Sequence, residues 1–435
     1  MKKTNSFKVI ILTILMLTFN SVTSVINAQN NIGKIEGIMA ESAIVMDMDT
    51  GEVIASKNAD KEMPVASTIK LLTSLIFAEN KSKSDTISFT EDALKTKITA
   101  LNNFKKLNVG DTISSEDLMK AVMIFSANDA AYLMADSVAG NSKDFVKLMN
   151  DKVKSFGLKN TRIVNPCGLE SDAINPNNKE INISTAYDMA IIASEAYKNE
   201  WIRDVISDKN KKTSIDLSGS PLYIDSRNKI LGEVGNIGGK TGNETKAGHC
   251  FVGYFERDGR KLVTVALKSQ YGADGMNVFN DTKKIADTGY KSKKQVYKKA
   301  SEEIGTIDLE FKAFRLFGPQ KSIIAPVIAT EDIMYYKNQI NDKNAKLDID
   351  DKNNNAWKLA NKEVEMTLLL PNNKSTISGK IDISTFDLLK MNVGIYAVTI
   401  LGIAIVVAII IVGAKFINDR NRSSRRRYKN RYRRR

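Results

Sequence analysis

The feature that most constrains this chain is a stretch of 24 residues without a charged side chain, residues 391–414, close to the C-terminal end. It is rich in Ile, Val, Ala and Gly. A helix of this length is long enough to cross the hydrocarbon core of a bilayer with some tilt. We therefore expect residues 391–414 to form a transmembrane helix in a lipid bilayer, and we expect the main folded part to precede it.

The charge of the chain is concentrated at its ends. The formal net charge is +14, which alone would suggest a nucleic-acid partner. However, residues 415–435 hold eleven Lys or Arg and one Asp, and residues 1–28 hold three lysines and no acid, so the rest is nearly neutral. Positive flanks of a span stay on the cytoplasmic side. We expect a cytoplasmic basic tail at 415–435, an extracellular main domain and no nucleic-acid partner. Nucleic-acid binding by the tail is the alternative.

The N-terminal segment has the pattern of a secretory signal peptide. Lys2, Lys3 and Lys8 precede a largely apolar run at 9–19, and Ala28 is a small residue suited to cleavage. We predict a signal peptide at residues 1–28. An uncleaved N-terminal anchor is the alternative, although the run is short for a membrane span.

Residues 29–290 alternate between strand and helix patterns. Apolar and polar residues alternate at 43–56 and 248–268 around turn residues, which predicts two β-hairpins. Helical periodicity follows, which predicts the helices that begin near residue 66 and span 114–139, 144–156 and 185–196. Helices bracketed by antiparallel hairpins indicate an α+β fold.

Residues 291–390 have a different pattern. A lysine-rich stretch at 283–299 leads into this region, and strong helical periodicity is absent from 305–388. Short apolar runs at 306–311, 322–328 and 364–370 indicate strands. We predict a linker and a small β domain at 291–390.

The first motif that carries chemistry is Ser67-Thr68-Ile69-Lys70. Residues three apart on a helix share one face, so the side chains of Ser67 and Lys70 can meet. A serine hydroxyl becomes a good nucleophile when a neighbouring base takes its proton. A lysine can be that base if desolvation or a nearby cation lowers its pKa. Alone, the pattern fits any ordinary helix start.

Two further motifs follow in order. Ser126-Ala127-Asn128 offers a hydroxyl that could relay a proton and an amide that could hold both the lysine and a substrate peptide. Lys240-Thr241-Gly242 precedes the second hairpin and would present a cation and a hydroxyl to a carboxylate. Its glycine would let another backbone approach closely. Each motif alone also fits a surface turn or an ordinary helix.

Other chemistries have little support in this sequence. His249 is the only histidine, and no Gly-x-Ser-x-Gly motif accompanies it, which argues against a Ser-His-Asp triad. One histidine and two cysteines argue against a structural zinc site. Cys167 and Cys250 are either buried thiols or one disulfide.

Taken together, the three motifs are the set of penicillin-binding proteins and β-lactamases. From about residue 35 to 290 the chain resembles the low-molecular-weight penicillin-binding proteins, the serine-type D-alanyl-D-alanine carboxypeptidases. The segments that carry this resemblance are 64–70 (PVASTIK), 126–131 (SANDAA), 165–169 (NPCGL), 184–188 (STAYD) and 239–242 (GKTG).

The resemblance implies a transpeptidase fold of the penicillin-binding and β-lactamase kind, an antiparallel sheet with helices, for a catalytic domain at 29–290. It implies removal of the terminal D-alanine from the peptidoglycan stem pentapeptide through an acyl-enzyme, with β-lactam antibiotics as covalent inhibitors. It implies no metal and no organic cofactor.

The resemblance also assigns catalytic roles. Ser67 attacks the carbonyl of the penultimate D-alanine, and Lys70 is the general base. Ser126 helps to pass the proton to the leaving amine. The backbone N–H groups of Ser67 and Asn243 form the oxyanion hole, which commonly contributes roughly 3–4 kcal/mol per donor.

The implied substrate-binding residues lie in the second and third motifs. Asn128 positions Lys70 and the substrate backbone. Lys240 and Thr241 engage the side of the terminal carboxylate, and Gly242 belongs to the same strand.

Two positions depart from the family pattern. Many relatives carry His-Tyr-Ser where this chain has Asn182-Ile183-Ser184, and many carry Arg at the position of Val278. In relatives that Arg helps to hold the terminal carboxylate. The departure at Val278 therefore concerns substrate affinity and activity, and leaves the three motifs intact.

Three alternatives share the fold. A class A β-lactamase adds a Glu-x-x-Leu-Asn pentad, which is absent between Asn128 and Lys240. A D,D-transpeptidase differs in using an amine as acceptor instead of water. A catalytically inactive penicillin-binding scaffold is the third, against which the intact motifs argue.

Overall fold

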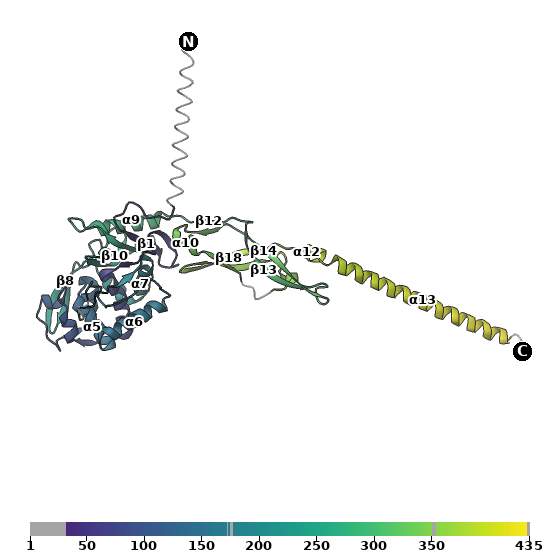
Figure 1. Ribbon diagram of the computed structural model, residues 1–435, viewed down its shortest axis with the longest axis horizontal. Coiled ribbons are helices and arrows are strands. Elements are labelled where there is room, and N and C mark those ends of the chain that lie inside the picture. The colour runs from purple at the N-terminus through teal and green to yellow at the C-terminus, as the bar shows by residue number, and fades with distance from the viewer. Residues whose placement is uncertain (1–31, 172, 175–176, 350–353, 433–435) are drawn as a thin grey trace, which may run out of the picture. The chain divides into compact units, whose positions relative to one another are not determined.

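The computed structural model describes residues 32–171, 173–174, 177–349 and 354–432, with side chains described up to residue 427. The predicted signal peptide at 1–28 lies outside the described residues. The chain divides into two units (Figure 1). The first comprises the residues up to Gln295 together with Tyr335–Ala345 and Leu370–Asn373, and the second comprises Val296–Met334, Lys346–Leu369 and the residues from Lys374 onward.

The first unit is built on an antiparallel five-stranded sheet of order β2-β1-β11-β10-β9. Its strands are β1 (Ser42–Asp47), β2 (Val53–Lys57), β9 (Asn236–Glu244), β10 (Gly248–Arg257) and β11 (Arg260–Ser269). Both predicted hairpins, β1–β2 and β10–β11, are confirmed. Asp258 and Gly259 turn the second hairpin with φ of 52° and 78°, the left-handed region that such tight turns require. Strand β9 lies at the sheet edge.

Helices account for much of the rest of the first unit. They are η1 (Ala66–Ile69), α2 (Lys70–Asn80), α3 (Glu91–Lys95), η2 (Leu101–Asn103), α4 (Ser115–Lys120), η3 (Ala121–Phe125), α5 (Asn128–Ala139), α6 (Ser142–Ser155), α7 (Ala186–Lys198), α8 (Glu200–Ile206), α9 (Asn277–Lys291) and α10 (Gln339–Asn344). Short two-stranded sheets pair β3 (Met63–Pro64) with β6 (Ile183–Ser184), β4 (Thr86–Ser88) with β5 (Thr112–Ser114), and β7 (Lys212–Leu217) with β8 (Ser220–Asp225).

Polar residues fix where these helices begin. The side chains of Thr90, Ser114, Asn141, Thr185 and Asn199 each accept a hydrogen bond from a backbone N–H in the first turn of the following helix. Such caps satisfy donors that have no partner within the helix. The predicted helices at 144–156 and 185–196 are confirmed as α6 and α7.

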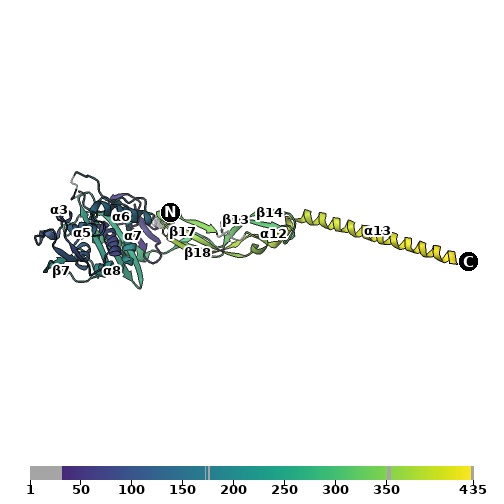
Figure 2. The same ribbon diagram turned by 90° about the horizontal axis from the view of Figure 1, so that it is seen from below.

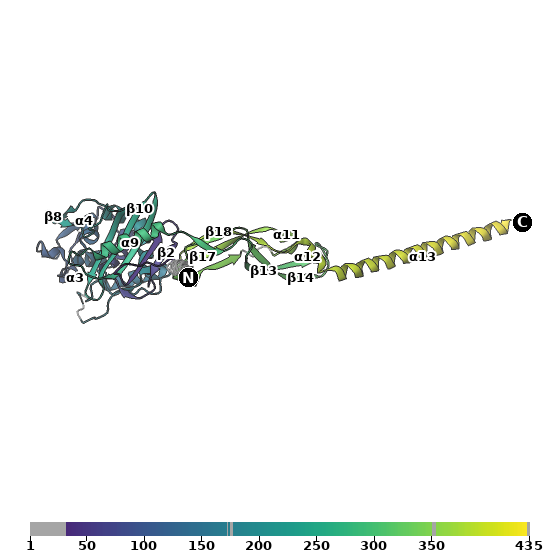
Figure 3. The same cartoon turned by 90° about the horizontal axis from the view of Figure 1, so that it is seen from above.

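The two faces of the sheet belong to two hydrophobic clusters. Alternate β1 residues divide between them: Ile44 and Met46 face the helical side, and Ala43 and Val45 face α9. This period of two follows from the strand pleat. Figures 2 and 3 view the unit from opposite sides, with α5, α6, α7 and α8 in front in one view and α9 in front of the sheet in the other. Every residue of α2 from Lys70 to Phe77 is buried, so α2 is the central helix.

The helix predicted over 114–139 is not continuous, and this prediction was wrong in that respect. Helix α4 passes into a π-helical turn at Ala121–Phe125, and Ser126 has φ of 72° and ψ of 32°. Helix α5 then begins at Asn128. The apolar residues on both sides of the break are buried, so their periodicity gives no sign of it. π-Turns inside helices are often found at functional sites.

Residues 335–345 group with the first unit, although the sequence analysis placed them in the β domain. The side-chain amides of Asn338 and Asn341 both donate to the carbonyl of Val53 and to that of Tyr336. Both asparagines are buried. Their amides supply the hydrogen bonds that hold the segment containing α10 against β2.

The second unit contains a five-stranded sheet of order β13-β14-β18-β17-β16. Its elements are β12 (Gln295–Lys298), β13 (Glu303–Lys312), β14 (Gln320–Ala329), β15 (Ile333–Tyr335), β16 (Lys346–Ile349), α11 (Ala356–Leu359), β17 (Glu363–Leu370), β18 (Asn373–Ile381), α12 (Thr385–Lys390) and α13 (Val393–Tyr432). The three predicted strand runs fall within β13, β14 and β17. Leu309, Phe311, Val327 and Leu368 are among its buried residues.

Helix α13 contains most of the apolar stretch recognised in the sequence. Within the described part of the chain it is the one helix long and apolar enough to cross a membrane. Its apolar side chains from Val398 to Val412 are largely exposed, as expected for a lipid-facing surface. Near its start, the Tyr396 hydroxyl donates to the carbonyl of Ala313.

One buried carboxylate ties the start of the described chain to α9. Asp281 accepts hydrogen bonds from the backbone N–H groups of Met39 (2.9 Å) and Ala40 (2.7 Å) and from the Ser269 hydroxyl (2.6 Å). Only 3% of its surface is exposed. Removing the carboxylate would leave these donors without their partner in a buried setting.

We predict that Asp281→Ala lowers the free energy of unfolding of the first unit by about 3 kcal/mol, because buried donors lose a charged acceptor. Asp287→Ala on the same helix is the control, since its ion pair with Arg257 is partly exposed to solvent and contributes about 1 kcal/mol or less. Urea unfolding followed by Trp201 fluorescence in a Trp357→Phe background measures both. Equal stabilities of the two variants would contradict this role.

Candidate active site

Ser67 and Lys70 lie side by side, as the sequence spacing predicts. Ser67 is in the 3₁₀ turn η1, and Lys70 is the first residue of α2. Residues three apart in a 3₁₀ turn eclipse one another. The lysine Nζ is 2.7 Å from the Ser67 Oγ. A hydroxyl and an amine at this distance can exchange a proton.

The surroundings of Lys70 favour its neutral form. The side chain is fully buried, and Nζ also lies 2.6 Å from the Asn128 Oδ1 and 2.7 Å from the Cys167 carbonyl oxygen. All three neighbours are uncharged, so burial dominates and lowers the pKa of Lys70 to about 8. A neutral amine has two donors for the amide and the carbonyl, and a lone pair for the serine hydroxyl.

The loop at 165–169 supplies the carbonyl that holds Lys70. Gly168 has φ of 89°, and a Cβ there would lie 2.0 Å from the carbonyl oxygen of Ala66, so only glycine fits. The Asn165 side chain accepts from the N–H groups of Cys167 and Gly168. Asn182 in turn accepts from the N–H groups of Val164 and Asn165, and donates to the Asn165 carbonyl. Asn182 thus has a defined part in shaping the loop.

Ser126 and Asn128 reach the site from the break between η3 and α5. The Asn128 amide nitrogen donates to the carbonyl of Ile98 at 2.7 Å, which points its oxygen toward Lys70. Ser126 stands on the other side, 2.8 Å from the Nζ of Lys240. The break therefore lets two residues only two apart in the chain contact two different lysines.

Strand β9 brings the third motif to the same place. Lys240 Nζ contacts the Ser126 hydroxyl and the carbonyl of Thr241, at 2.8 and 2.9 Å. Burial, the charge of Lys70 and the charge of Arg227 all lower the pKa of Lys240. A Cβ on Gly242 would lie 3.2 Å from the Ser67 nitrogen, so the glycine allows the strand to pass close to η1.

Backbone strain surrounds the nucleophile. Ala66, Thr99 and Ser126 have φ of 47°, 48° and 72°, values that residues with side chains seldom adopt. Ala66 precedes Ser67 directly, and the carbonyl of Thr99 accepts from the N–H of Asn128. Strained residues of this kind cluster at functional sites, where the surrounding structure holds them in place.

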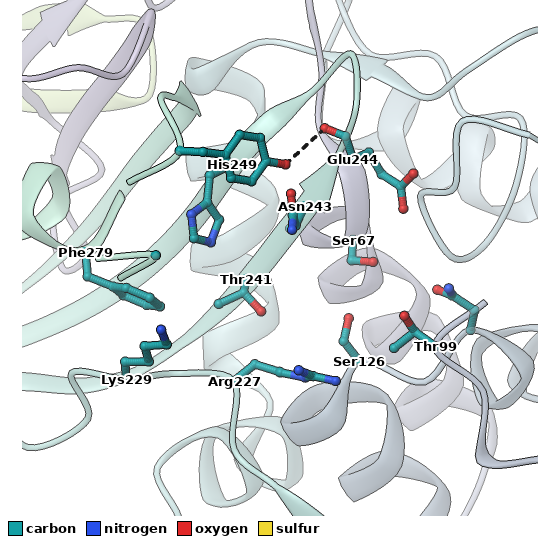
Figure 4. A pocket seen from close by; sticks show the side chains of 14 residues that line it. Ser67, Thr99, Ser126, Arg227, Lys229, Thr241, Asn243, Glu244, His249 and Phe279 are labelled. Carbon is teal, nitrogen blue, oxygen red and sulfur yellow. Dashed lines mark hydrogen bonds between the residues drawn. The ribbon is translucent and has the colours of Figure 1, made fainter. Parts of the chain in front are cut away.

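A cavity of about 360 Å³ opens over these residues (Figure 4). It is lined by Ser67, Thr99, Ser126, Asn128, Arg227, Lys229, Thr241, Gly242, Asn243, Glu244, His249, Tyr271, Gly275 and Phe279. Most of the predicted site residues line it. Lys70 and Lys240 lie beneath, in contact with Ser67 and Ser126.

Three charged residues of the cavity were not predicted from the sequence. Arg227 stacks its guanidinium over the Phe125 ring, 4.7 Å from the centroid. Lys229 donates to the carbonyl of Asp274. Glu244 ends strand β9 two residues after Gly242. Only the position of Glu244, directly after the third motif, gave a signal in the sequence.

The remaining candidates for chemistry have structural explanations. Cys167 and Cys250 are both buried free thiols and do not form a disulfide. His249 stacks on Tyr271 with centroids 5.8 Å apart, and burial lowers its pKa. Among the described residues, no group of three or more His, Cys, Asp or Glu could hold a metal ion. Val278 is buried in the cluster between α9 and the sheet, away from the cavity lining.

Comparison with known proteins agrees with this geometry. A family profile described as D-alanyl-D-alanine carboxypeptidase, peptidase S11, matches residues 27–270, more than half of the chain. The chain is 30% identical over 233 residues to the D-alanyl-D-alanine carboxypeptidase DacF of Bacillus subtilis, covering 52% of this chain and 57% of the relative. It is 31% identical over 261 residues to DacC of Escherichia coli, covering 58% and 61%. The match thus spans about three fifths of these relatives.

The fold is shared with solved penicillin-binding proteins. Penicillin-binding protein D2 from Listeria monocytogenes, solved in an ampicillin-bound form, matches with a TM-score of 0.51 and 28% identity, over 59% of this chain and 99% of that one. A D-alanyl-D-alanine carboxypeptidase from Mycobacterium tuberculosis matches with a TM-score of 0.53 and 25% identity, over 59% and 92%. The motifs, their geometry and the matched region agree: the chain belongs to the S11 family of D-alanyl-D-alanine carboxypeptidases.

Proposed function

We propose that this chain is a serine-type D-alanyl-D-alanine carboxypeptidase that removes the terminal D-alanine from peptidoglycan stem pentapeptides. The observation that carries the proposal is the buried Lys70 amine, 2.7 Å from the Ser67 hydroxyl, with a pKa lowered to about 8. At this pKa a substantial fraction of the lysine is neutral near physiological pH, and a neutral amine can act as a general base. The family membership supports the same activity.

Acylation begins at Ser67. Lys70 takes the hydroxyl proton while Oγ attacks the carbonyl carbon of the penultimate D-alanine, forming a C–O bond. The backbone N–H groups of Ser67 and Asn243 receive the oxyanion that develops. The C–N bond then breaks, and the proton reaches the leaving amine through Ser126. D-Alanine departs and the peptide remains as an ester on Ser67.

Ser126 is well placed for the proton relay, because it contacts Lys240 and lines the cavity. Asn128 contacts Lys70 through its oxygen and fixes the position of the amine. Lys240 and Thr241 lie on the side assigned to the terminal carboxylate. Gly242 lets β9 pass close to η1, and as an edge strand β9 can pair with an extended peptide.

Water completes the cycle by hydrolysing the ester. A β-lactam follows the same first step, and its ring opens to give an adduct on Ser67. The reaction as written uses side chains, backbone groups and water, with no metal or organic cofactor. A D,D-transpeptidase, a β-lactamase and an inactive scaffold differ in the fate of the acyl group, so product analysis separates them.

We further propose that α13 anchors the protein in a lipid bilayer through residues 391–414, with the first unit outside the cell and the basic tail at 415–435 in the cytoplasm. The support is the single long apolar helix among the described residues and the run of arginines that follows it. The proposed substrate is extracellular, and this orientation gives the site access to it. The proposal includes no nucleic-acid partner.

We predict that Ser67→Ala abolishes covalent labelling by a fluorescent penicillin and abolishes D-alanine release from a pentapeptide. Ser155→Ala, an exposed helix residue, is the control and should keep both. Mass spectrometry of the labelled wild-type chain should place the adduct on Ser67. An adduct on another serine would contradict the assignment. Rapid hydrolysis of the penicillin would indicate a β-lactamase, and transfer to an added amine a transpeptidase.

We predict that the second-order acylation rate with a β-lactam rises with pH and levels off near pH 8. The base works when unprotonated, so below a pKa of about 8 the rate should fall by about tenfold per pH unit. Lys70→Arg should lose acylation nearly as fully as Lys70→Ala, because arginine keeps its proton. Lys154→Arg, at an exposed site, is the control. Near-native rates for Lys70→Arg would assign the base to another group.

We predict that trypsin added to intact cells digests the first unit and spares an epitope tag placed after Arg435. The arginines beside the tag should become accessible only after permeabilisation, because the bilayer shields them. Loss of the tag in intact cells would reverse the proposed orientation.

A further inference from the structure

Charges of opposite sign lie on different sides of the nucleophile. Figure 4 shows Arg227 and Lys229 on one side of Ser67 and Ser126, and Glu244 on the other. All of them line the same cavity. This separation of charge favours one orientation of a bound peptide that carries one negative and one positive group.

The carboxylate of Glu244 is half-buried in the cavity wall. Within the described part of the chain, no lysine or arginine forms an ion pair with it. Burial raises the pKa of Glu244, and the charge of Glu170 raises it further. The charge of Lys70 and a hydrogen bond from the Glu170 backbone act in the opposite direction. A cation bound beside Glu244 would offset the burial and the repulsion.

Glu170 does not compete for such a cation to the same extent. Its Oε1 accepts hydrogen bonds from the backbone N–H groups of Lys246 and Ala247, in the turn between β9 and β10. Glu170 holds this turn, and it does not appear among the residues that line the cavity. Glu244 is the acidic side chain that the cavity presents to a ligand.

The basic residues on one side of the cavity indicate the orientation in which the peptide binds. The terminal carboxylate of the leaving D-alanine is assigned to the side of Lys240 and Thr241, where Arg227 and Lys229 also line the cavity. The scissile carbonyl lies at Ser67, so the acyl portion of the peptide continues on the other side, past Asn243 to Glu244. Residues 241–244 are consecutive on the edge strand β9, along which an extended peptide can lie.

We propose that Glu244 binds a protonated amine on the acyl portion of the substrate, and that the enzyme therefore prefers stem peptides whose diamino acid side chain carries a free amine. The inference rests on the proposed function, since it assigns a specificity to the same site. It concerns recognition of the acyl portion, and leaves the acylation chemistry of Ser67 and Lys70 as described.

Two other roles of Glu244 would have different kinetic effects. As a base for the hydrolytic water, Glu244 would speed hydrolysis of every acyl group. As a charge that tunes Lys70, it would shift the pH profile of acylation for every substrate. Recognition of an amine affects only substrates that possess one.

The test compares two pentapeptides that end in D-Ala-D-Ala and differ at one lysine side chain, free in one and acetylated in the other. Release of D-alanine by the detergent-solubilised full chain gives kcat/KM for each. We expect the wild-type enzyme to prefer the free amine by about tenfold, the size of one charge-assisted contact. Glu244→Gln should lose this preference, because the KM for the free amine should rise more than the KM for the acetylated peptide.

Two further variants complete the design. Glu233→Gln, which removes an exposed carboxylate paired with Lys283, is the matched control and should keep the preference. Glu244→Lys should reverse it in favour of a succinylated lysine, whose side chain ends in a carboxylate. Covalent labelling by fluorescent penicillin should persist in both Glu244 variants, which reports a folded site.

The outcomes separate the two proposals. No D-alanine release and no penicillin adduct in the wild-type chain would overturn the proposed function. Activity with equal kcat/KM for both peptides would overturn the role of Glu244 alone. An equal loss on both peptides in Glu244→Gln would also overturn it, in favour of a role in the chemistry.

Discussion

The burial of one amine governs the organisation of this site. Lys70 Nζ meets Ser67 Oγ, Asn128 Oδ1 and the Cys167 carbonyl, three neutral oxygens at 2.6 to 2.7 Å. An ammonium ion in such a setting loses its hydration without a carboxylate in contact, and burial outweighs the more distant charges of Glu244 and Asp129, so the neutral form becomes accessible. A nearby carboxylate in place of any of the three would restore the charge and remove the base. Other elements of the first unit position these three oxygens around the amine.

Each oxygen comes from a different part of the chain and is held by its own contacts. Asn165 and Asn182 shape the loop that aims the Cys167 carbonyl. The break at Ser126 turns Asn128 toward Lys70 and places the Ser126 hydroxyl against Lys240. The edge strand β9 closes the arrangement, because Gly242 lets it run beside η1. Two buried lysines thus lie close together. Burial lowers both of their pKa values, and the charge of Lys70 lowers that of Lys240 further.

The sequence predicted the parts of this structure that depend on local patterns. Both hairpins follow from alternation and turn residues, and the Ser67–Lys70 contact follows from a spacing of three. The break at Ser126 was not predicted, because the apolar periodicity continues across it. The break depends on tertiary contacts and not on a local pattern. Asn182 was noted as a departure from relatives, and only the fold shows that it bonds the loop at 164–165. Arg227 and Lys229 line the same cavity as Ser67 and Ser126, which are distant in the chain, and such charged residues have no local signature. Only the position of Glu244, two residues after Gly242, pointed to the site. The attachment of residues 335–345 to β2 likewise rests on two side-chain amides that no pattern distinguishes from others.

The position of β1 in the sheet sets an order of events for the newly made chain. Strand β1 begins at Ser42, yet its partner on one side is β11, with Ser42 opposite Leu267 and Asp47 opposite Leu262. Nearly the whole helical region is made between these two strands. Until β11 has been synthesised, β1 has only the short β2 as a neighbour, and its other edge stays open to pairing with foreign strands. Contacts so distant along the chain also slow folding. The central sheet therefore cannot close until the chain has been made as far as Ser269, and everything that folds earlier does so around an incomplete sheet.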